Sequence, residues 1–188
     1  MAFLYNKISR KFLLSLIILW GLVSFYQLNQ SSPTKILIIA FGVFALILTI
    51  METAPMFLLI YLSFTTAYAF YGFLFQYNLP VWLIMLGLLT IFGYVYLYIE
   101  QKIGILGNKR LIYLVLFCII ILEIFLGLSY FLISPLSKSL IIAIVSYLFV
   151  GFSYTVLAKH SGKLATYVLI ALSTIVMLFI SSSWGGAI

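Results

Sequence analysis

Long apolar runs separated by short polar breaks make up almost the whole chain. Each run is close to the length of about 20 residues with which a helix crosses the hydrocarbon core of a bilayer. Seven runs are found, at residues 12–28, 36–51, 56–75, 81–99, 111–133, 140–158 and 164–180. The pattern predicts an all-α, polytopic transmembrane helix bundle with seven spans, which forms a single integral membrane domain over residues 1–188.

Proline positions support the boundaries of these runs. Pro33, Pro55, Pro80 and Pro135 lie at or just before the start of a run. The first turn of a helix leaves its backbone N–H groups unpaired, so the missing N–H of proline costs nothing there. The prolines are therefore typical of helix starts.

The composition makes lipid the main solvent of the protein. The chain is 66% apolar and only 7% charged, whereas about a quarter of the residues of a soluble domain are charged. The net charge of +7 does not indicate nucleic-acid binding, because the basic residues are few and lie at the ends of the runs.

The polar breaks differ in charge between the two sides of the membrane. With seven spans, one side carries Lys7, Arg10, Lys11, Lys102, Lys109, Arg110, Lys159 and Lys163, and the other carries only Lys35 and Lys138. Cytoplasmic loops hold the excess of Lys and Arg. This asymmetry predicts a cytoplasmic N-terminus and a C-terminus outside.

Glu123 is the only charged residue within any of the seven runs. A carboxyl group at the middle of the bilayer costs a few kcal/mol and marks a candidate functional site. Glu123, Gly127 and Tyr130 follow one helical stripe, and Gly127 allows a neighbouring helix to come close. We expect Glu123 to face the bundle interior, as a proton or ligand contact that hydrogen-bonds a hydroxyl group.

The third and sixth runs carry the candidate hydroxyl groups and further glycines for helix packing. Each run has a stripe of hydroxyl-bearing and small residues of the kind found at buried helix contacts. The candidates are Thr65, Tyr68 and Gly72 in the third run, and Tyr147, Gly151 and Tyr154 in the sixth. The sequence leaves open which run meets Glu123.

The two other glutamates have simpler interpretations. Glu52 is expected at the inner interface near the start of the third run, where a carboxylate caps a helix or favours its positive end. Glu100 lies beside Lys102 and is interpreted as a solvated loop charge.

The chain lacks the residue clusters of most enzymes and metal sites. It has three acidic residues, one histidine and one cysteine. Metal hydrolysis needs several His, Cys or carboxylate ligands, and Mg²⁺ chemistry needs paired carboxylates. We therefore expect no enzyme, no metal site and no cofactor.

Two outer loops look alike, either by chance or because the chain contains an internal repeat. Residues 32–40 and 134–143 both combine a Ser-Pro turn and a lysine with a following Ile-rich segment. The first three spans would then correspond to the last three in the same orientation, as parallel repeats do in transporters. A chance match between Leu/Ile-rich segments is the alternative.

The C-terminal third resembles uncharacterised small multi-span membrane proteins of small-genome bacteria. The stretches that carry this resemblance are Glu123-Ile124-Phe125-Leu126-Gly127-Leu128-Ser129-Tyr130-Phe131, Ser134-Pro135-Leu136 and Ser183-Trp184. The resemblance implies a multi-pass protein of the bacterial inner membrane and no particular activity.

Two functions remain open at this point. The first is a small carrier or transport-complex subunit in which Glu123 contacts a proton or substrate. The second is a non-catalytic scaffold or assembly partner in which Glu123 only fixes helix packing. The partners expected are the lipid bilayer and either another membrane protein or a second copy of the chain.

Overall fold

Six helices form the protein in the computed structural model, which describes residues 2–29, 32–103 and 110–157. Each of these helices is long and apolar enough to cross a membrane, so the chain is a multi-pass membrane protein. The helices are α1 (Ala2–Leu28), α2 (Ser32–Met51), α3 (Pro55–Phe75), α4 (Val81–Ile103), α5 (Arg110–Ser129) and α6 (Pro135–Leu157). The expected seventh span, residues 164–180, lies outside the described residues.

Proline begins helices as expected. Pro55 and Pro135 are the first residues of α3 and α6, and Pro80 directly precedes α4. The helix α2 begins at Ser32, four residues before the apolar run that predicted it. The Ser-Pro-Thr-Lys turn therefore forms the first turn of α2, which makes this short span long enough to cross the bilayer.

The end of α5 differs from the prediction. The fifth apolar run continues to residue 133, but α5 ends at Ser129. Tyr130 N–H donates to the Gly127 carbonyl at 3.3 Å and Phe131 N–H to the Leu128 carbonyl at 3.2 Å, as in a turn. The hydropathy pattern overestimated the length of this helix, because hydropathy does not distinguish an apolar turn from an apolar helix.

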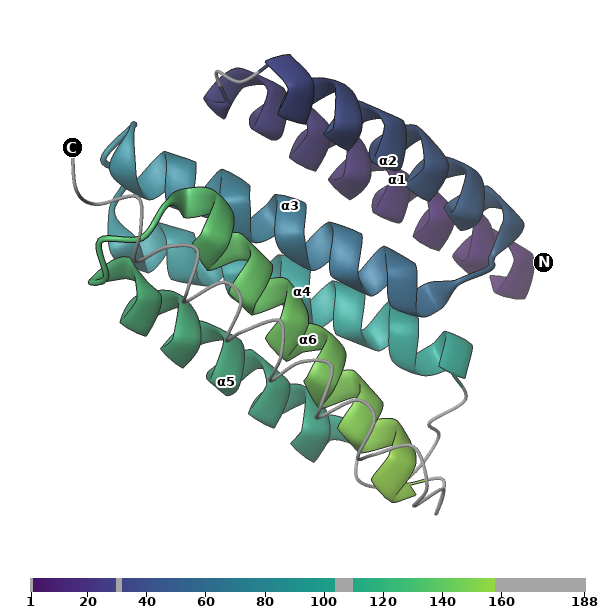
Figure 1. Ribbon diagram of the computed structural model, residues 1–188. Helices are drawn as coiled ribbons and strands as arrows, with labels where there is room; N and C mark the ends of the chain where they lie inside the picture. Colours follow the sequence, from purple (N-terminus) through teal and green to yellow (C-terminus); the bar gives the residue numbers. More distant parts are fainter. Residues whose placement is uncertain (1, 30–31, 104–109, 158–188) are drawn as a thin grey trace.

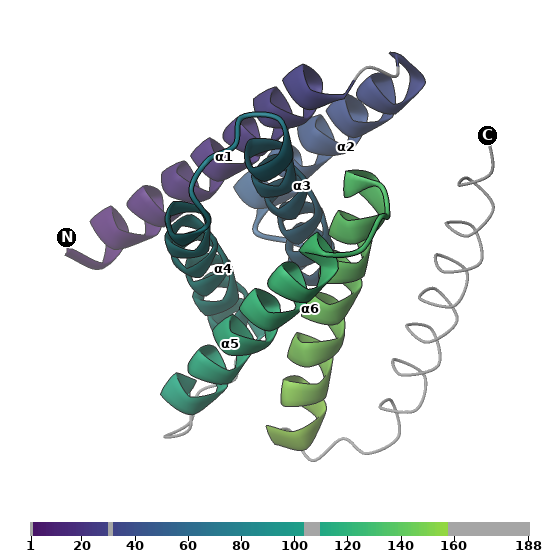
Figure 2. The same ribbon diagram turned by 90° about the vertical axis from the view of Figure 1, so that its left-hand side faces the viewer.

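The helix α3 lies at the centre of the bundle. It packs most extensively against α6 and also contacts α1, α2 and α4. Figure 1 shows α1 and α2 side by side above α3, with α5 and α6 below it, and Figure 2 shows α2 and α5 toward the outside of the bundle. Nearly every residue from Leu58 to Gly72 is buried, so the interior of this membrane protein is built around one helix.

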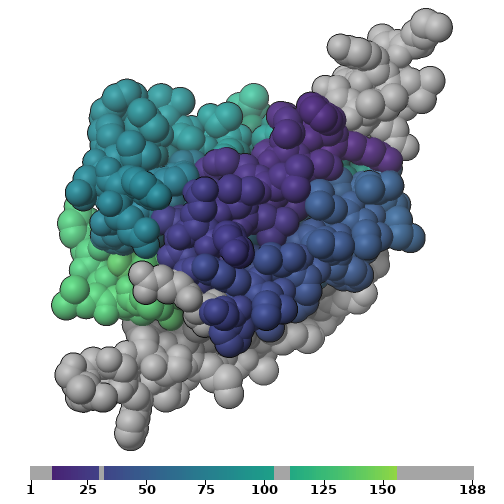
Figure 3. Space-filling model, turned by 90° about the horizontal axis from the view of Figure 1, so that it is seen from above, coloured from purple at the N-terminus to yellow at the C-terminus, as the bar shows by residue number. Residues whose placement is uncertain are grey.

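Glycine in α1 allows the close approach of α1 to α3. A Cβ atom at Gly21 would lie 2.8 Å from the Thr65 Oγ1 atom and 3.0 Å from its Cβ atom. Thr65 is fully buried and β-branched, so it has little freedom to move. Figure 3 shows α1 and α2 together covering one face of the bundle.

The last three described helices repeat the order of the first three. Each set is a helical hairpin followed by a helix that begins with proline and enters the central α3–α6 pair. Residues 68–73 and 147–152 share Tyr, Phe, Gly and Phe at the same spacing. The second set of three helices therefore runs antiparallel to the first. The parallel repeat considered from the sequence includes the expected seventh span, which lies outside the described residues, so it stays untested.

Candidate functional site

Glu123 lies on the outer surface of α5. Its side chain is exposed, and within the described residues it makes no hydrogen bond or ion pair. The buried face of α5 is formed by Phe117, Ile121 and Phe125. Glu123 is two residues from both Ile121 and Phe125, so it points about 160° away from them around the helix. The expectation that Glu123 faces the interior is therefore wrong for the described part of the chain.

Large aromatic contacts decide this orientation of α5. The Tyr71 and Phe125 rings stack with centroids 4.2 Å apart, and the Tyr71 hydroxyl donates to the Phe125 carbonyl at 3.0 Å. Phe117 packs against Tyr96 with centroids 4.9 Å apart. Lipid tails are as apolar as these rings, so the orientation of α5 is selected by how well the rings pack and by the Tyr71 hydrogen bond.

Glu123 lies off the middle of α5. Because α5 ends at Ser129, Glu123 lies only about 9 Å of helix length from that end. The apolar run that continues past Ser129 had placed it at mid-depth. The carboxyl group is therefore nearer to the end of α5 than to its start, with apolar residues on both sides of it along the chain.

The helical stripe of Glu123, Gly127 and Tyr130 is not covered by any described helix. At Gly127, an added Cβ atom would meet nothing within 4 Å, so no described helix packs there. Tyr130, which follows the end of α5, is 87% exposed. The carboxyl group, the glycine and the tyrosine thus form an uncovered face, which we call the α5 outer face.

The candidate residues of α3 lie in the interior, away from this face. Thr65 is fully buried, and its hydroxyl donates to the Tyr61 carbonyl at 3.0 Å. Tyr68 is buried with its ring 4.4 Å from the Phe25 ring, centroid to centroid. Gly72 is buried against Leu28 of α1.

The candidate residues of α6 are half-buried or buried. Tyr147 and Tyr154 have intermediate exposure, and Gly151 is buried. The structure therefore brings Thr65, Tyr68 and Gly72 together on the central helix. Within the described part of the chain, none of these hydroxyl groups hydrogen-bonds to Glu123.

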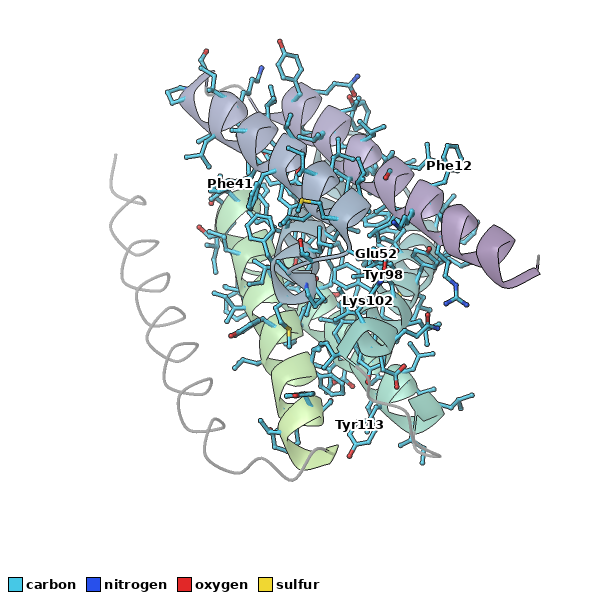
Figure 4. The ribbon with its side chains drawn as sticks, turned by 90° about the vertical axis from the view of Figure 1, so that its right-hand side faces the viewer. Phe12, Phe41, Glu52, Tyr98, Lys102 and Tyr113 are labelled. Carbon is cyan, nitrogen blue, oxygen red and sulfur yellow. The ribbon has the colours of Figure 1, made fainter. Side chains whose placement is uncertain are left out.

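A charged cluster joins the helix ends where the basic residues gather. Lys11 of α1 pairs with Glu52 at 2.9 Å, and Lys102 of α4 also pairs with Glu52. Figure 4 shows Glu52 close to Lys102 and Tyr98. We call this end of the bundle the basic end. One carboxylate therefore links α1, the α2–α3 turn and α4.

The backbone at Glu52 adopts a conformation that disfavours side chains. Glu52 follows the last residue of α2 with φ at 57°, in the left-handed region. Its N–H donates to the Thr49 carbonyl at 3.4 Å, and the Thr53 N–H donates to the Leu48 carbonyl at 3.1 Å. This is the Schellman motif, which normally has glycine at the left-handed position. A glutamate there indicates that its two ion pairs offset the strain.

Glu52 lies near the start of α3, as expected, but it does not cap that helix. It lies at the start of α3 as predicted, but the residue before that helix is Ala54, and no side chain caps the helix. Lys11 instead caps the end of α2, because its ammonium group donates to the Ile50 carbonyl at 3.0 Å. The carboxylate joins helices rather than capping one.

Glu100 is not a solvated loop charge. It lies within α4 and is only 2% exposed. On the neighbouring residue, the Gln101 side chain accepts a hydrogen bond from Arg10, and Tyr94 donates to the Arg10 carbonyl at 3.0 Å. The polar end of α4 packs against α1. The segment that was expected to be a solvated loop is therefore a buried part of α4.

Sequence reasoning missed the convergence of Lys11, Glu52 and Lys102. The available signal was the predicted topology, which puts all three residues on the same side of the membrane. The sequence does not show that these residues meet, because Lys11 and Lys102 are far apart in the chain. They become neighbours only when α1 packs near α4.

The described residues contain no cluster of three His, Cys, Asp or Glu side chains that would hold a metal ion. Comparison of the chain with protein-family models, curated proteins and solved structures finds no match. The α5 outer face and the basic end are the two polar features of the described helices that stand apart from the apolar packing.

Proposed function

We propose that the protein is a non-catalytic subunit of a bacterial inner-membrane complex and that the α5 outer face binds a transmembrane helix of another protein. The observation that supports this proposal is the exposed Glu123 side chain, in an otherwise apolar helix face. A carboxyl group against lipid tails costs a few kcal/mol. A partner helix that hydrogen-bonds this group removes that cost.

The surroundings of Glu123 suit such a helix. Gly127, one turn away, has open space beside it, and glycine lets two helix backbones approach closely. Tyr130 offers a second hydrogen-bonding group at the end of the same face. The partner is thus a helix with a hydrogen-bond donor facing Glu123 and small residues facing Gly127.

The charges favour a different protein over a second copy. A symmetric contact through this face would place one Glu123 carboxyl group opposite another. Within the described spans, the lysines with exposed or half-exposed side chains lie at helix ends and not beside Glu123. A partner that supplies an amide, hydroxyl or basic donor at that depth is more complementary.

Site-specific photo-crosslinking tests this proposal. A photoreactive amino acid at Ile119, which is 45% exposed and one turn from Glu123, should crosslink to one defined membrane protein. The matched control is Ile47 of α2, 47% exposed, where only lipid adducts are expected. Glu123→Leu should reduce the Ile119 crosslink at least ten-fold, a loss of about 1.4 kcal/mol.

Two results would contradict the proposal. Adducts at Ile119 that consist of lipid alone would mean that this face has no protein partner. A crosslink at Ile119 to a second copy of the chain, or to residues 164–180 of the same chain, would show that the face is covered by the protein itself.

A small carrier remains the second candidate, on a separate observation. The hydroxyl groups of Ser63 and Thr66 on α3 are buried and have no hydrogen-bond partner among the described residues. They lie on the central helix of an antiparallel pair of three-helix sets, and inverted repeats place transporter substrate sites at their interface.

Uptake by reconstituted vesicles separates the candidates. For a carrier, the double change Ser63→Ala and Thr66→Val should reduce uptake by more than ten-fold. Ser146→Ala is the control, because that hydroxyl is satisfied by the Ile142 carbonyl at 2.8 Å in its own helix. Proton-linked uptake that is lost in Glu123→Gln would assign the proton contact to Glu123, and absence of uptake for any solute would remove this candidate.

A further inference from the structure

Two lysines at the basic end share one carboxylate. The Lys11 ammonium group lies 2.9 Å from one carboxylate oxygen of Glu52, and the Lys102 ammonium group pairs with the other oxygen. Among the described residues, neither lysine pairs with a second acidic side chain. Two positive charges therefore share one negative charge, and the site has an excess positive charge.

The two ammonium groups are accessible from outside the protein and have hydrogen-bond donors to spare. An ammonium group has three N–H donors. Lys11 directs one at Glu52 and one at the Ile50 carbonyl, and Lys102 directs one at Glu52. The two lysine side chains are 34% and 28% exposed, whereas Glu52 is 18% exposed. Since both lysines contact the same carboxylate, one phosphate group in front of it can accept a hydrogen bond from each.

Large apolar side chains lie directly beside these charges. Ile50, whose carbonyl accepts from Lys11, and Met51 are the last residues of α2, and they are 68% and 64% exposed. Phe12 follows Lys11 in α1 and is 65% exposed, and Figure 4 shows it projecting outward from that helix. A small soluble anion would cover none of this apolar surface. An anion that carries hydrocarbon chains covers it while its charge meets the lysines.

The position of the site along the helices matches the depth of lipid headgroups. Lys11 lies at the start of the first apolar span, Glu52 follows the end of α2, and Lys102 is the last residue but one of α4. Basic residues at the ends of membrane spans attract anionic lipids, and each contributes about five-fold to the affinity.

We infer that the basic end binds an anionic phospholipid, with its phosphate between Lys11 and Lys102 and its acyl chains against Ile50, Met51 and Phe12. The single negative charge of a phosphodiester such as phosphatidylglycerol balances the second lysine. Phosphatidylethanolamine fits less well, because its own ammonium group is repelled by the two lysines. The bound phosphate joins α1 to α4 beside Glu52.

Native mass spectrometry of the full chain in detergent, titrated with phosphatidylglycerol, tests this inference. Lys11→Gln and Lys102→Gln should each weaken binding about five-fold, and the double variant about 25-fold. The single Lys102→Gln variant keeps the ion pair between Lys11 and Glu52, so it reports on binding even if the double variant fails to fold. Unchanged affinity in Lys102→Gln would overturn the inference.

The matched control is Lys35→Gln at the opposite end of the bundle. Lys35 lies in the first turn of α2, with its ammonium group 4.6 Å from the centroid of the exposed Tyr26 ring. This variant should bind phosphatidylglycerol as the unchanged protein does. An equal loss of affinity in Lys35→Gln and Lys102→Gln would mean that the lipid responds only to net charge, which would contradict a defined site.

Glu52→Gln separates lipid binding from the structural role of the ion pairs. It removes the negative charge that competes with the phosphate and keeps both lysines, so the affinity for phosphatidylglycerol should rise. If Glu52→Gln weakens binding as much as the double lysine variant does, the lipid depends on the folding of this end and not on the ammonium groups. That result would overturn the inference.

Two lipid comparisons complete the test. Phosphatidylethanolamine should bind at least ten-fold more weakly than phosphatidylglycerol, about 1.4 kcal/mol, and equal affinities would contradict a site for an anion. Glycerol 3-phosphate, which has the phosphate but no acyl chains, should not compete. Competition as strong as that of phosphatidylglycerol would assign the site to a soluble phosphate instead of a lipid. The inference is independent of the α5 outer face, because its residues come from α1, α2, the α2–α3 turn and α4.

Discussion

Single charged residues have different roles at the two ends of the bundle. At the basic end, Glu52 accepts ion pairs from Lys11 and Lys102 in a strained turn. At the opposite end, Lys138 is 3% exposed, and its ammonium group lies 4.5 Å from the Phe75 ring centroid and 5.5 Å from that of Tyr71. Both charges fix helix ends, but only Glu52 has partners of opposite charge among the described residues.

Two substitutions at Glu52 should separate the effect of backbone strain on stability from the effect of the ion pairs. Glu52→Ala removes both ion pairs and keeps a side chain in the left-handed conformation. Glu52→Gly removes the same pairs and relieves the strain, which is about 1 kcal/mol. Glu52→Gly should therefore be more stable than Glu52→Ala by about 1 kcal/mol, as measured by thermal unfolding in detergent. Equal melting temperatures would show that the turn is not strained.

Removal of Lys138 should cost more stability than removal of Lys35. Both ammonium groups lie over an aromatic ring, Lys35 at 4.6 Å from the exposed Tyr26 ring. Lys138 is buried and also approaches the Ser129 carbonyl at 3.5 Å. Cation–π contacts are worth about 0.5–1 kcal/mol when exposed and about 2 kcal/mol when desolvated. Lys138→Ala should therefore lower the melting temperature clearly more than Lys35→Ala, and the reverse order would contradict this assignment.

At the scale of helices, the sequence predicted the existence of each element better than its rotation. The apolar runs and prolines located all six described helices. The helix α1 begins at Ala2, ten residues before its apolar run, and the other ends differ by at most five residues. The rotation of α5 could not be predicted, because almost every position on it is apolar. Its buried face is chosen by the fit of Phe117 and Phe125 against Tyr96 and Tyr71, which are far away in the chain.

Glycines on buried and open helix faces should respond oppositely to alanine. Gly21→Ala would push a methyl group against Thr65, and overpacking costs about 1–3 kcal/mol. Gly127→Ala meets nothing within 4 Å and should stabilise α5 by up to about 1 kcal/mol. The measurement is the thermal stability of each purified variant. Destabilisation by Gly127→Ala would mean that a part of the protein outside the described residues covers that face.

At the scale of the whole molecule, the contacts group the charges as the topology predicted. Arg10, Lys11 and Lys102 meet at the basic end, and Lys35 begins α2 at the opposite end. Which end faces the cytoplasm stays a prediction from the excess of Lys and Arg. The structure shows which helix ends lie together, but it does not show which of the two ends of the bundle faces the cytoplasm.

Cysteine labelling in intact cells tests this orientation. In a Cys118→Ala background, which removes the natural cysteine, a cysteine at Gln76 should react with a reagent that cannot cross the membrane. A cysteine at Thr53, in the turn at the basic end, should react only after the cells are permeabilised. Both positions are exposed, so the opposite pattern of labelling would reverse the orientation.

The sequence by itself determined the solvent of this protein, the positions of its spans and the isolation of Glu123. These properties are local, because they depend on the length of apolar runs and on where proline interrupts them. Only the tertiary structure decided which way Glu123 points and which charges meet Glu52. Those properties depend on the packing of large side chains between distant helices, and a uniformly apolar chain carries no local signal for it.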